Sequence, residues 1–131
     1  MARQRFMPLL SVVASTALIS QSSAFAFDLF VQKPYTLRCT FTSGELTTLG
    51  RVSPNVPSWA FDLKIDKKSK TVLYRGAQLV DGKFGAGSVQ FFFKAMGDSH
   101  KMLLDLNRLV FVSSYSDDVS SLTRRGKCRR T

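Results

Sequence analysis

The feature that most constrains the fold is a strict alternation of apolar and polar residues in short segments. Between residues 35 and 42 the odd positions are apolar or cysteine, and the even positions are polar. Side chains of a β-strand alternate between its two faces, so this segment predicts a strand with one buried and one solvated face. The same alternation recurs over residues 59–66 and 88–94.

The alternating segments are short and are separated by glycine, proline and charged turns. Such short links leave no room for the crossovers that parallel strands need. We therefore predict an all-β fold, an antiparallel meander of about 7–8 strands that forms a small sandwich or a barrel. Within it we expect a turn at 43–44, a hairpin of 59–66 with 71–74, a short strand at 77–80, a glycine-rich connection at 81–87 and a last strand at 119–123.

The first 26 residues have the three parts of a secretory signal peptide. Arg3 and Arg5 supply a positive start, residues 9–19 form an apolar run, and Ala24-Phe25-Ala26 matches a cleavage site. The apolar run is shorter than the roughly 20 residues that span a bilayer. We therefore predict a cleaved N-terminal signal helix at 1–26 and an exported protein, periplasmic or secreted, that is not transmembrane after cleavage.

The remaining chain is predicted to hold one β domain at 27–123 and a basic C-terminal tail at 124–131. Without the signal the net charge is about +8, because 17 basic residues face nine acidic ones. Three interpretations of the tail remain open: a contact for anionic partners, a solubilising end, or in part a strand end held by Cys128. The residues of the possible anion contact are Arg124, Arg125, Lys127, Arg129 and Arg130.

The chain contains two cysteines, Cys39 on the predicted dry face of the first strand and Cys128 near the C-terminus. Two cysteines in an exported chain fit one disulfide, so we predict a Cys39–Cys128 bond. The alternative is a free, reactive Cys128 on a flexible tail. The bond would join the first strand to the last segment of the chain.

Residues able to support catalysis are scarce. His100 is the only histidine, and its neighbours Asp98 and Ser99 resemble a triad only in sequence. Adjacent residues of an extended segment point to opposite faces, so we interpret His100 as an exposed residue where a strand begins. One histidine and two distant cysteines do not supply a metal site. We predict no enzyme activity, no metal and no cofactor.

Two kinds of binding site remain open. Arg38, Lys64, Phe92 and Lys94 all fall on predicted wet faces and form a possible binding surface, in which Phe92 is the outward aromatic residue. Alternatively, Trp59, Phe61, Phe91 and Phe93 line an interior cavity that holds a small molecule.

Four motifs carry a resemblance to a group of proteins. They are Y-x-L-x-C-x-F at 35–41, I-D-x-x-x-K-T-V at 65–72, Asn107-Arg108-Leu109 and Gly126-Lys127-Cys128. Together they resemble uncharacterised small exported two-cysteine β-domain proteins of proteobacteria, a group without a known activity. A more distant likeness is to periplasmic inhibitors of c-type lysozyme, small disulfide-closed barrels whose S-G-x-x-Y and W-x-K-G signatures are missing here. A cationic chain also complements cationic lysozyme poorly.

The sequence thus favours an exported, non-enzymatic binding or envelope-associated module that contacts anionic surfaces such as an envelope polymer or lipid. The alternative is a calycin-like carrier of a small molecule with an aromatic-lined interior. The arginines of the tail are not interleaved with aromatic residues, so sequence-specific nucleic-acid binding is not expected.

Overall fold

The computed structural model describes residues 33–131. All regular elements of this part are strands: β1 (Tyr35–Thr48), β2 (Arg51–Pro54), β3 (Phe61–Asp66), β4 (Thr71–Tyr74), β5 (Gln78–Phe84), β6 (Ser88–Ala95), β7 (Asp98–Asp105), β8 (Val110–Ser116) and β9 (Ser120–Arg130). All neighbouring strands pair antiparallel. The all-β antiparallel prediction is confirmed.

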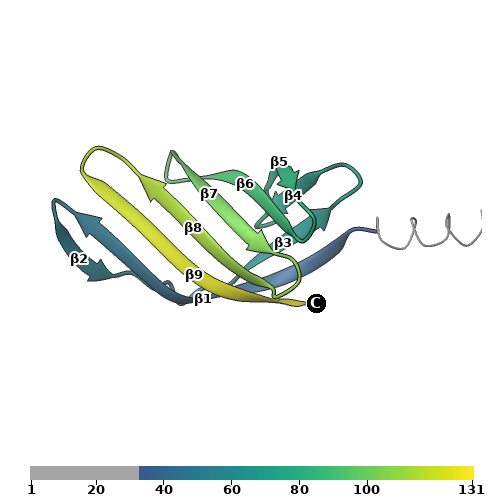
Figure 1. Cartoon of the computed structure of the whole chain (residues 1–131), viewed down its shortest axis with the longest axis horizontal. Coiled ribbons are helices and arrows are strands. Elements are labelled where there is room, and N and C mark those ends of the chain that lie inside the picture. The colour runs from purple at the N-terminus through teal and green to yellow at the C-terminus, as the bar shows by residue number, and fades with distance from the viewer. Residues whose placement is uncertain (1–32) are drawn as a thin grey trace, which may run out of the picture. The chain divides into compact units, whose positions relative to one another are not determined.

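The first and last long strands pair with each other and close the sheet into a barrel (Figure 1). The barrel consists of β1 and β3 to β9, whereas β2 is an extra strand that pairs only with the second half of β1. Of the two architectures that the sequence left open, the barrel is therefore the one that forms. Closure removes the free edges of the β1 to β9 circuit.

Strand β1 is longer than predicted, because the expected turn at 43–44 does not form. Its first half pairs with β3 and its second half with β2, while β9 pairs along both halves. The register to β9 shifts between Phe41 and Ser43, which marks a β-bulge. Before the bulge the odd-numbered residues of β1, up to Phe41, face the interior. After the bulge the even-numbered residues do so, beginning with Gly44.

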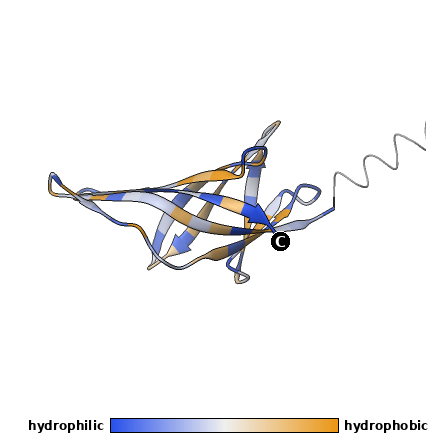
Figure 2. Cartoon of the chain, turned by 90° about the horizontal axis from the view of Figure 1, so that it is seen from below, coloured by the Kyte–Doolittle hydropathy of each residue, from blue (hydrophilic) through white to orange (hydrophobic). Residues whose placement is uncertain are grey.

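The core follows the period-two alternation on which the prediction rested. Hydrophobic and hydrophilic residues alternate along the strands (Figure 2). The buried apolar side chains come from every barrel strand except β5 and β9, which contribute partly buried ones: Leu37, Cys39, Phe61, Leu63, Ile65, Val72, Tyr74, Val89, Phe91, Phe93, Met102, Leu104 and Phe111.

Cys39 and Cys128 form the predicted disulfide. They stand directly opposite each other in the β1–β9 register. The Cys128 N–H donates to Leu109 O at 2.7 Å, on the β8 side of the strand. The bond therefore crosses the seam that closes the barrel. A structural disulfide indicates the oxidising surroundings that exported proteins reach.

Two strand boundaries differ from the prediction. The expected strand 77–80 and the first part of the glycine-rich connection are one strand, β5, which runs through Gly82 to Phe84. Strand β3 begins at Phe61, so Trp59 lies in the preceding loop rather than in the strand, and 42% of its surface is exposed. Its ring still packs against the interior, as described below.

The predicted basic tail is the largest difference. Strand β9 does not end at Thr123 but continues to Arg130, and it pairs with β1 on one side and β8 on the other. Of the three interpretations left open for residues 124–131, the strand end held by Cys128 is the one that forms, and β9 runs through the boundary placed at 123. The arginines and lysines fit into a strand because alternation lets most of their side chains face solvent while Gly126 and Cys128 face inward.

The predicted signal peptide at 1–26 lies outside the described residues. Within residues 33–131 no helix has the length and apolar composition that crossing a membrane requires.

Candidate functional site

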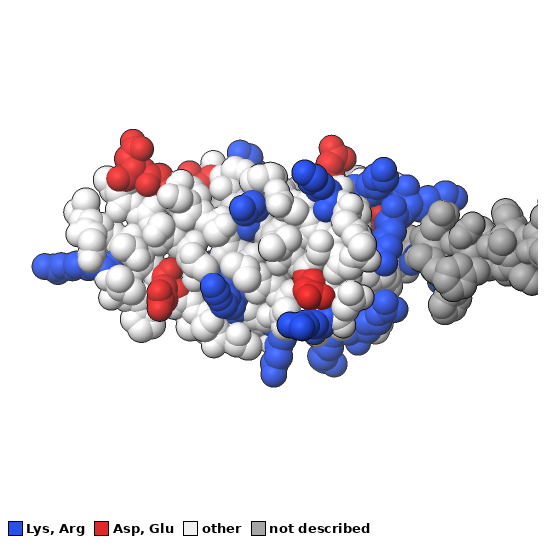
Figure 3. Space-filling view, in the orientation of Figure 1, with Lys and Arg blue, Asp and Glu red and all other residues white. Residues whose placement is uncertain are grey.

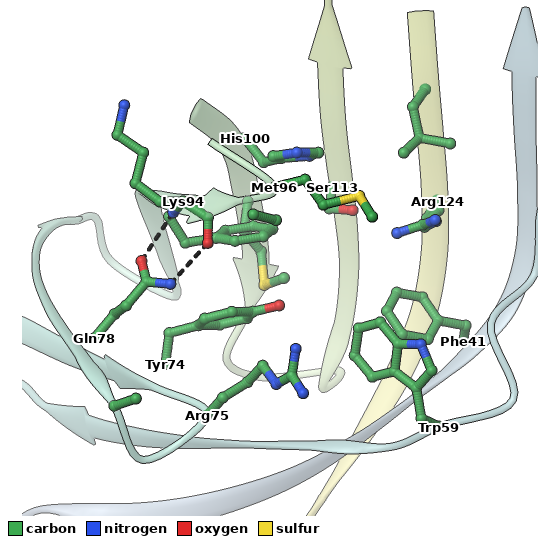
Figure 4. Close-up of a pocket in the computed structure, with 15 residues that line it drawn as sticks. Phe41, Trp59, Tyr74, Arg75, Gln78, Lys94, Met96, His100, Ser113 and Arg124 are labelled. Carbon is green, nitrogen blue, oxygen red and sulfur yellow. Dashed lines mark hydrogen bonds between the residues drawn. The ribbon is translucent and has the colours of Figure 1, made fainter. Parts of the chain in front are cut away.

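A cavity of about 710 Å³ opens at the end of the barrel that carries the β4–β5 and β6–β7 turns (Figure 4). Its walls are formed mainly by aromatic, apolar and cationic side chains from seven strands and three connections. The lining residues are Phe41, Trp59, Tyr74, Arg75, Ala77, Gln78, Phe93, Lys94, Ala95, Met96, His100, Met102, Ser113, Leu122 and Arg124. A volume of this size is typical of small-molecule sites.

Phe41 and Trp59 form one wall of the cavity. Their ring centroids are 5.0 Å apart at an interplanar angle of 78°. Each ring also contacts Phe61 below it, at 5.4 Å from Phe41 and 6.1 Å from Trp59. Close ring contacts of this kind fix ring orientation, so this wall is held in place by the core.

Arg124 reaches the cavity from β9, where it lies on the same inward face as Gly126 and Cys128. Its Nε and Nη2 donate to Asn55 Oδ1 at 3.0 and 2.6 Å, and its guanidinium carbon lies 5.6 Å from the centre of the Phe41 ring. Burial lowers the pKa of Arg124, which remains far above neutral pH for a guanidinium.

The loop that carries Asn55 is held close to β1 by a glycine. The Asn55 N–H donates to Gly44 O at 3.0 Å, and a Cβ at Gly44 would overlap the Asn55 carbonyl. Gly44 thus permits the close approach of two backbones that places Asn55 beside Arg124.

Arg75 lies in the connection between β4 and β5, on the other side of the cavity, and its guanidinium carbon is 4.8 Å from the centre of the Trp59 ring. Figure 4 shows the Arg75 and Arg124 side chains directed toward the Phe41–Trp59 wall, while the ammonium of Lys94 points away. The lining includes no Asp or Glu. The cavity therefore combines aromatic walls with uncompensated positive charge.

Four rings, one each from β4, β6, β7 and β8, stack in a row, and the first three of them line the opposite wall of the cavity. The centroid distances are 4.3 Å for Tyr74–Phe93, 5.2 Å for Phe93–His100 and 4.9 Å for His100–Tyr115. His100 is thus half-buried and lines the cavity, so its interpretation as an exposed residue was wrong. Burial lowers the pKa of His100, and the charge of Arg124 adds to this effect.

The barrel wall separates beside the cavity between β5 and β6. These strands pair only where Gly82, Lys83 and Phe84 meet β6. At the cavity end the side chain of Gln78 replaces the missing ladder: its amide nitrogen donates to Lys94 O at 2.7 Å, and its amide oxygen accepts from Lys94 N at 2.8 Å. Gln78 therefore satisfies the backbone of β6 at the cavity rim.

The residues of the predicted anion contact divide between two faces of β9. Arg124 faces the cavity, and Arg125, Lys127 and Arg129 are exposed on the outer face. Arg130 covers the ring of Tyr35, with its guanidinium carbon 4.1 Å from the ring centre. The five residues thus do not form one contact.

The structure also does not bring the predicted binding surface together. Arg38 lies on β1, where it forms a 3.2 Å ion pair with Asp62, and Lys64 lies exposed on β3. Phe92 and Lys94 belong to β6, and β4 and β5 separate the two pairs in the sheet. Phe92 does face outward, with 55% of its surface exposed.

The four aromatic residues predicted to line an interior cavity have two roles. Trp59 and Phe93 line the cavity. Phe61 and Phe91 are buried in the packed core and are not part of its wall. The interior is therefore filled in its middle and hollow at one end.

Sequence reasoning missed Arg75, Arg124 and His100 as lining residues. One signal was available for Arg124. Once Cys128 is paired with the inward Cys39, period-two alternation places Gly126, Arg124 and Leu122 on the inward face. Treating 124–131 as a tail prevented this step. Within residues 33–131 no group of three or more His, Cys, Asp or Glu side chains is arranged to hold a metal ion.

Comparison with known proteins gives no relative from which a role could be transferred. No family model matches the chain, and neither a curated protein nor a solved structure is significantly similar to it.

Proposed function

We propose that the protein is an exported, non-enzymatic binding protein whose ligand is a small anion with an apolar body, held in the cavity at the end of the barrel. The observation that carries this proposal is the composition of the lining. Two guanidiniums face a cavity of about 710 Å³ with aromatic walls and no carboxylate.

The arrangement favours an anion for electrostatic reasons. Arg124 is partly removed from water, and within residues 33–131 its side chain donates hydrogen bonds only to the neutral Asn55 oxygen. A charge-assisted hydrogen bond to an anionic ligand would replace lost hydration at Arg124, and the exposed Arg75 would add a second positive charge. The rings of Phe41, Trp59 and Phe93 would at the same time cover the apolar body of the ligand. This role corresponds to the carrier alternative of the sequence analysis.

Export rests on the predicted signal peptide and agrees with the disulfide. We propose the periplasm or the extracellular medium as the destination. Membership in the group of small exported two-cysteine proteins stays a prediction.

The fluorescence of Trp59 allows a direct test, since Trp59 is the only tryptophan of the chain and lies in the cavity wall. The probes are decanesulfonate and the uncharged decanol, which share one apolar chain. We expect decanesulfonate to change the Trp59 emission saturably and to bind at least about tenfold more tightly than decanol, as charge-assisted hydrogen bonds imply. Equal affinity of the two probes would contradict an anion site.

Neighbouring residues of β9 supply a matched pair of variants. R124Q removes the inward guanidinium, and R125Q removes the outward one with the same change of net charge. We expect R124Q to weaken decanesulfonate binding about tenfold or more and R125Q to leave it within about twofold. Calorimetry is the second readout, because it does not depend on the emission of Trp59. Equal losses in R124Q and R125Q would refute the site.

A further inference from the structure

Basic residues gather at the end of the barrel opposite the cavity. In an antiparallel meander successive turns alternate between the two ends, so the β3–β4 and β7–β8 turns lie at the end where β9 finishes. Figure 3 shows Lys and Arg concentrated at this end, where Figure 1 places the C-terminus. We define the basic end by six exposed residues: Lys67, Lys68, Lys70, Arg108, Arg129 and Arg130.

These six residues lie along one continuous arc of the rim. Arg108 belongs to the turn before β8, Arg129 and Arg130 to β9, and the lysines to the turn after β3. The strands β8, β9, β1 and β3 are neighbours in that order. The three segments are far apart in sequence, and only closure of the barrel brings them together.

The positive charge of the basic end is not neutralised within the described chain. Across residues 33–131 the only salt bridge joins Arg38 to Asp62, outside the arc. Three carboxylate side chains lie at this end, those of Asp66, Asp81 and Asp105. Asp66 Oδ1 accepts from the N–H groups of Lys68 and Ser69 at 3.1 and 3.2 Å. Asp105 Oδ1 accepts from those of Asn107 and Arg108, both at 2.9 Å.

Six cationic side chains therefore face three carboxylate side chains, two of which are directed into their own turns. Lys33, Lys64, Lys83 and Lys127 add further exposed positive charge near the same end. Like charges gathered at one end of the barrel repel each other in the free protein, and an anionic partner relieves that repulsion.

We infer that the basic end docks on the surface of a bilayer that contains anionic lipid. The six residues occupy turn tips and a strand end, and none of them lines the cavity at the far end or the two smaller hollows beside Asp62 and beside Gly44. A protruding rim fits an extended surface better than a polymer that needs a groove. Tyr35, the aromatic ring beside Arg130 on this arc, is covered by the Arg130 guanidinium and is not free to stack on a nucleobase.

This inference does not depend on the proposed ligand. Docking by the basic end would leave the cavity at the far end of the barrel open to the surrounding solution. The two activities can therefore be separated by variants, since no residue of the basic end lines the cavity.

The test is co-sedimentation with vesicles, using protein expressed from the full sequence and purified as the cell processes it. One set of vesicles contains phosphatidylglycerol in phosphatidylcholine, and the other is pure phosphatidylcholine. We expect binding only to the anionic vesicles and loss of this binding at high salt. Binding to both sets, or to neither, would overturn the inference.

Charge-matched variants locate the contact. K67Q/K68Q/K70Q removes three charges from the basic end, and R51Q/K101Q/R125Q removes three exposed charges elsewhere. Each basic residue near an anionic leaflet contributes roughly a fivefold factor, so we expect about a 100-fold loss for the first variant and less than about a threefold loss for the second. Equal losses in the two variants would mean that vesicle binding depends only on the net charge of the protein, and would refute docking by the basic end.

A second pair covers the other half of the arc without disturbing the Arg130–Tyr35 contact. R108Q/R129Q is compared with K101Q/R125Q, and we expect only the former to release the protein from anionic vesicles. Dextran sulfate serves as a soluble polyanion. Tight binding to this polymer together with no binding to anionic vesicles would mean that the partner is a soluble polyanion and not a lipid surface, and would overturn the inference. Decanesulfonate binding by all these variants should stay unchanged.

Discussion

Asn55 accepts two hydrogen bonds from the guanidinium of Arg124, at 3.0 Å from Nε and 2.6 Å from Nη2. The asparagine lies in the loop that crosses Gly44, and the arginine lies on β9, 69 positions later in the chain. A loop without regular structure thus determines where a cation is held inside the barrel.

The first prediction separates this positioning from the charge. N55A removes the acceptor, and we expect a loss of about 1–2 kcal/mol in the free energy of unfolding together with weaker decanesulfonate binding. N55D keeps the acceptor but neutralises Arg124, so we expect near-native stability and a larger loss of binding. Urea unfolding and titration of Trp59 emission measure the two effects. Tighter anion binding by N55D would contradict this account.

The disulfide is predicted to contribute a large part of the stability. It closes a loop of 89 positions between Cys39 and Cys128. In the chain-entropy model a loop of this length contributes about 4–5 kcal/mol. We expect C39A/C128A to lose free energy of unfolding on this scale in urea titrations. Thiol labelling of the native protein without reductant is the control and should detect no free cysteine. A loss below about 1 kcal/mol would show that the β1–β9 ladder alone holds the seam.

Gly126 is predicted to tolerate no side chain. It faces inward on β9, and a Cβ there would overlap the carbonyl oxygen of Thr40 and the ring of Phe111. We expect G126A to cost about 1–3 kcal/mol through overpacking. G85A is the matched control, because a Cβ at Gly85 meets only the hydroxyl of Ser88, at 3.1 Å. Chemical denaturation compares the two, and an equal cost would contradict steric exclusion at Gly126.

The stability of the protein is predicted to fall as the medium is acidified through the range where histidine titrates. Burial lowers the pKa of His100 in the fold. The unfolded chain, with a histidine pKa of about 6.5, therefore binds more protons, and stability decreases as the pH falls through this value. Thermal unfolding between about pH 7.5 and about pH 5 measures this decrease, which H100N should reduce.

Ligand binding should respond to pH with the opposite sign. Protonated His100 adds a positive charge to the cavity lining, so decanesulfonate should bind more tightly as the pH falls. This probe stays ionised over the whole range, which leaves His100 as the titrating group beside Arg124. Binding by H100N should depend less on pH. Weaker binding of the sulfonate at low pH by the native protein would contradict an anion site next to His100.

The sequence was sufficient to predict the strands of the core, because period-two alternation is a pattern within one short segment. It was also sufficient for the disulfide, because two cysteines allow only one pairing within the chain. It was insufficient for β9, because five basic residues suggested a solvated tail. Pairing of Cys128 with Cys39 implies instead that every second residue of this segment faces inward. The cavity could not be predicted from sequence, since Trp59, Arg75 and Arg124 meet there only through the bulge after Phe41 and the loop over Gly44. The bulge and the loop both depend on how distant strands pair when the barrel closes, and no short segment of the sequence shows them.

Pairing of β1 with β9 also sets the order of events when the chain folds. The barrel cannot close until residue 130 is available, so β1 keeps an unpaired edge while every intervening strand is added. Contacts so distant in sequence are associated with slow folding. Cys39 must wait as a thiol over the same interval. Since the sequence contains only one other cysteine, a mispaired disulfide can form only between two molecules. Correct oxidation during export therefore requires a protein concentration low enough for the bond within one molecule to form first.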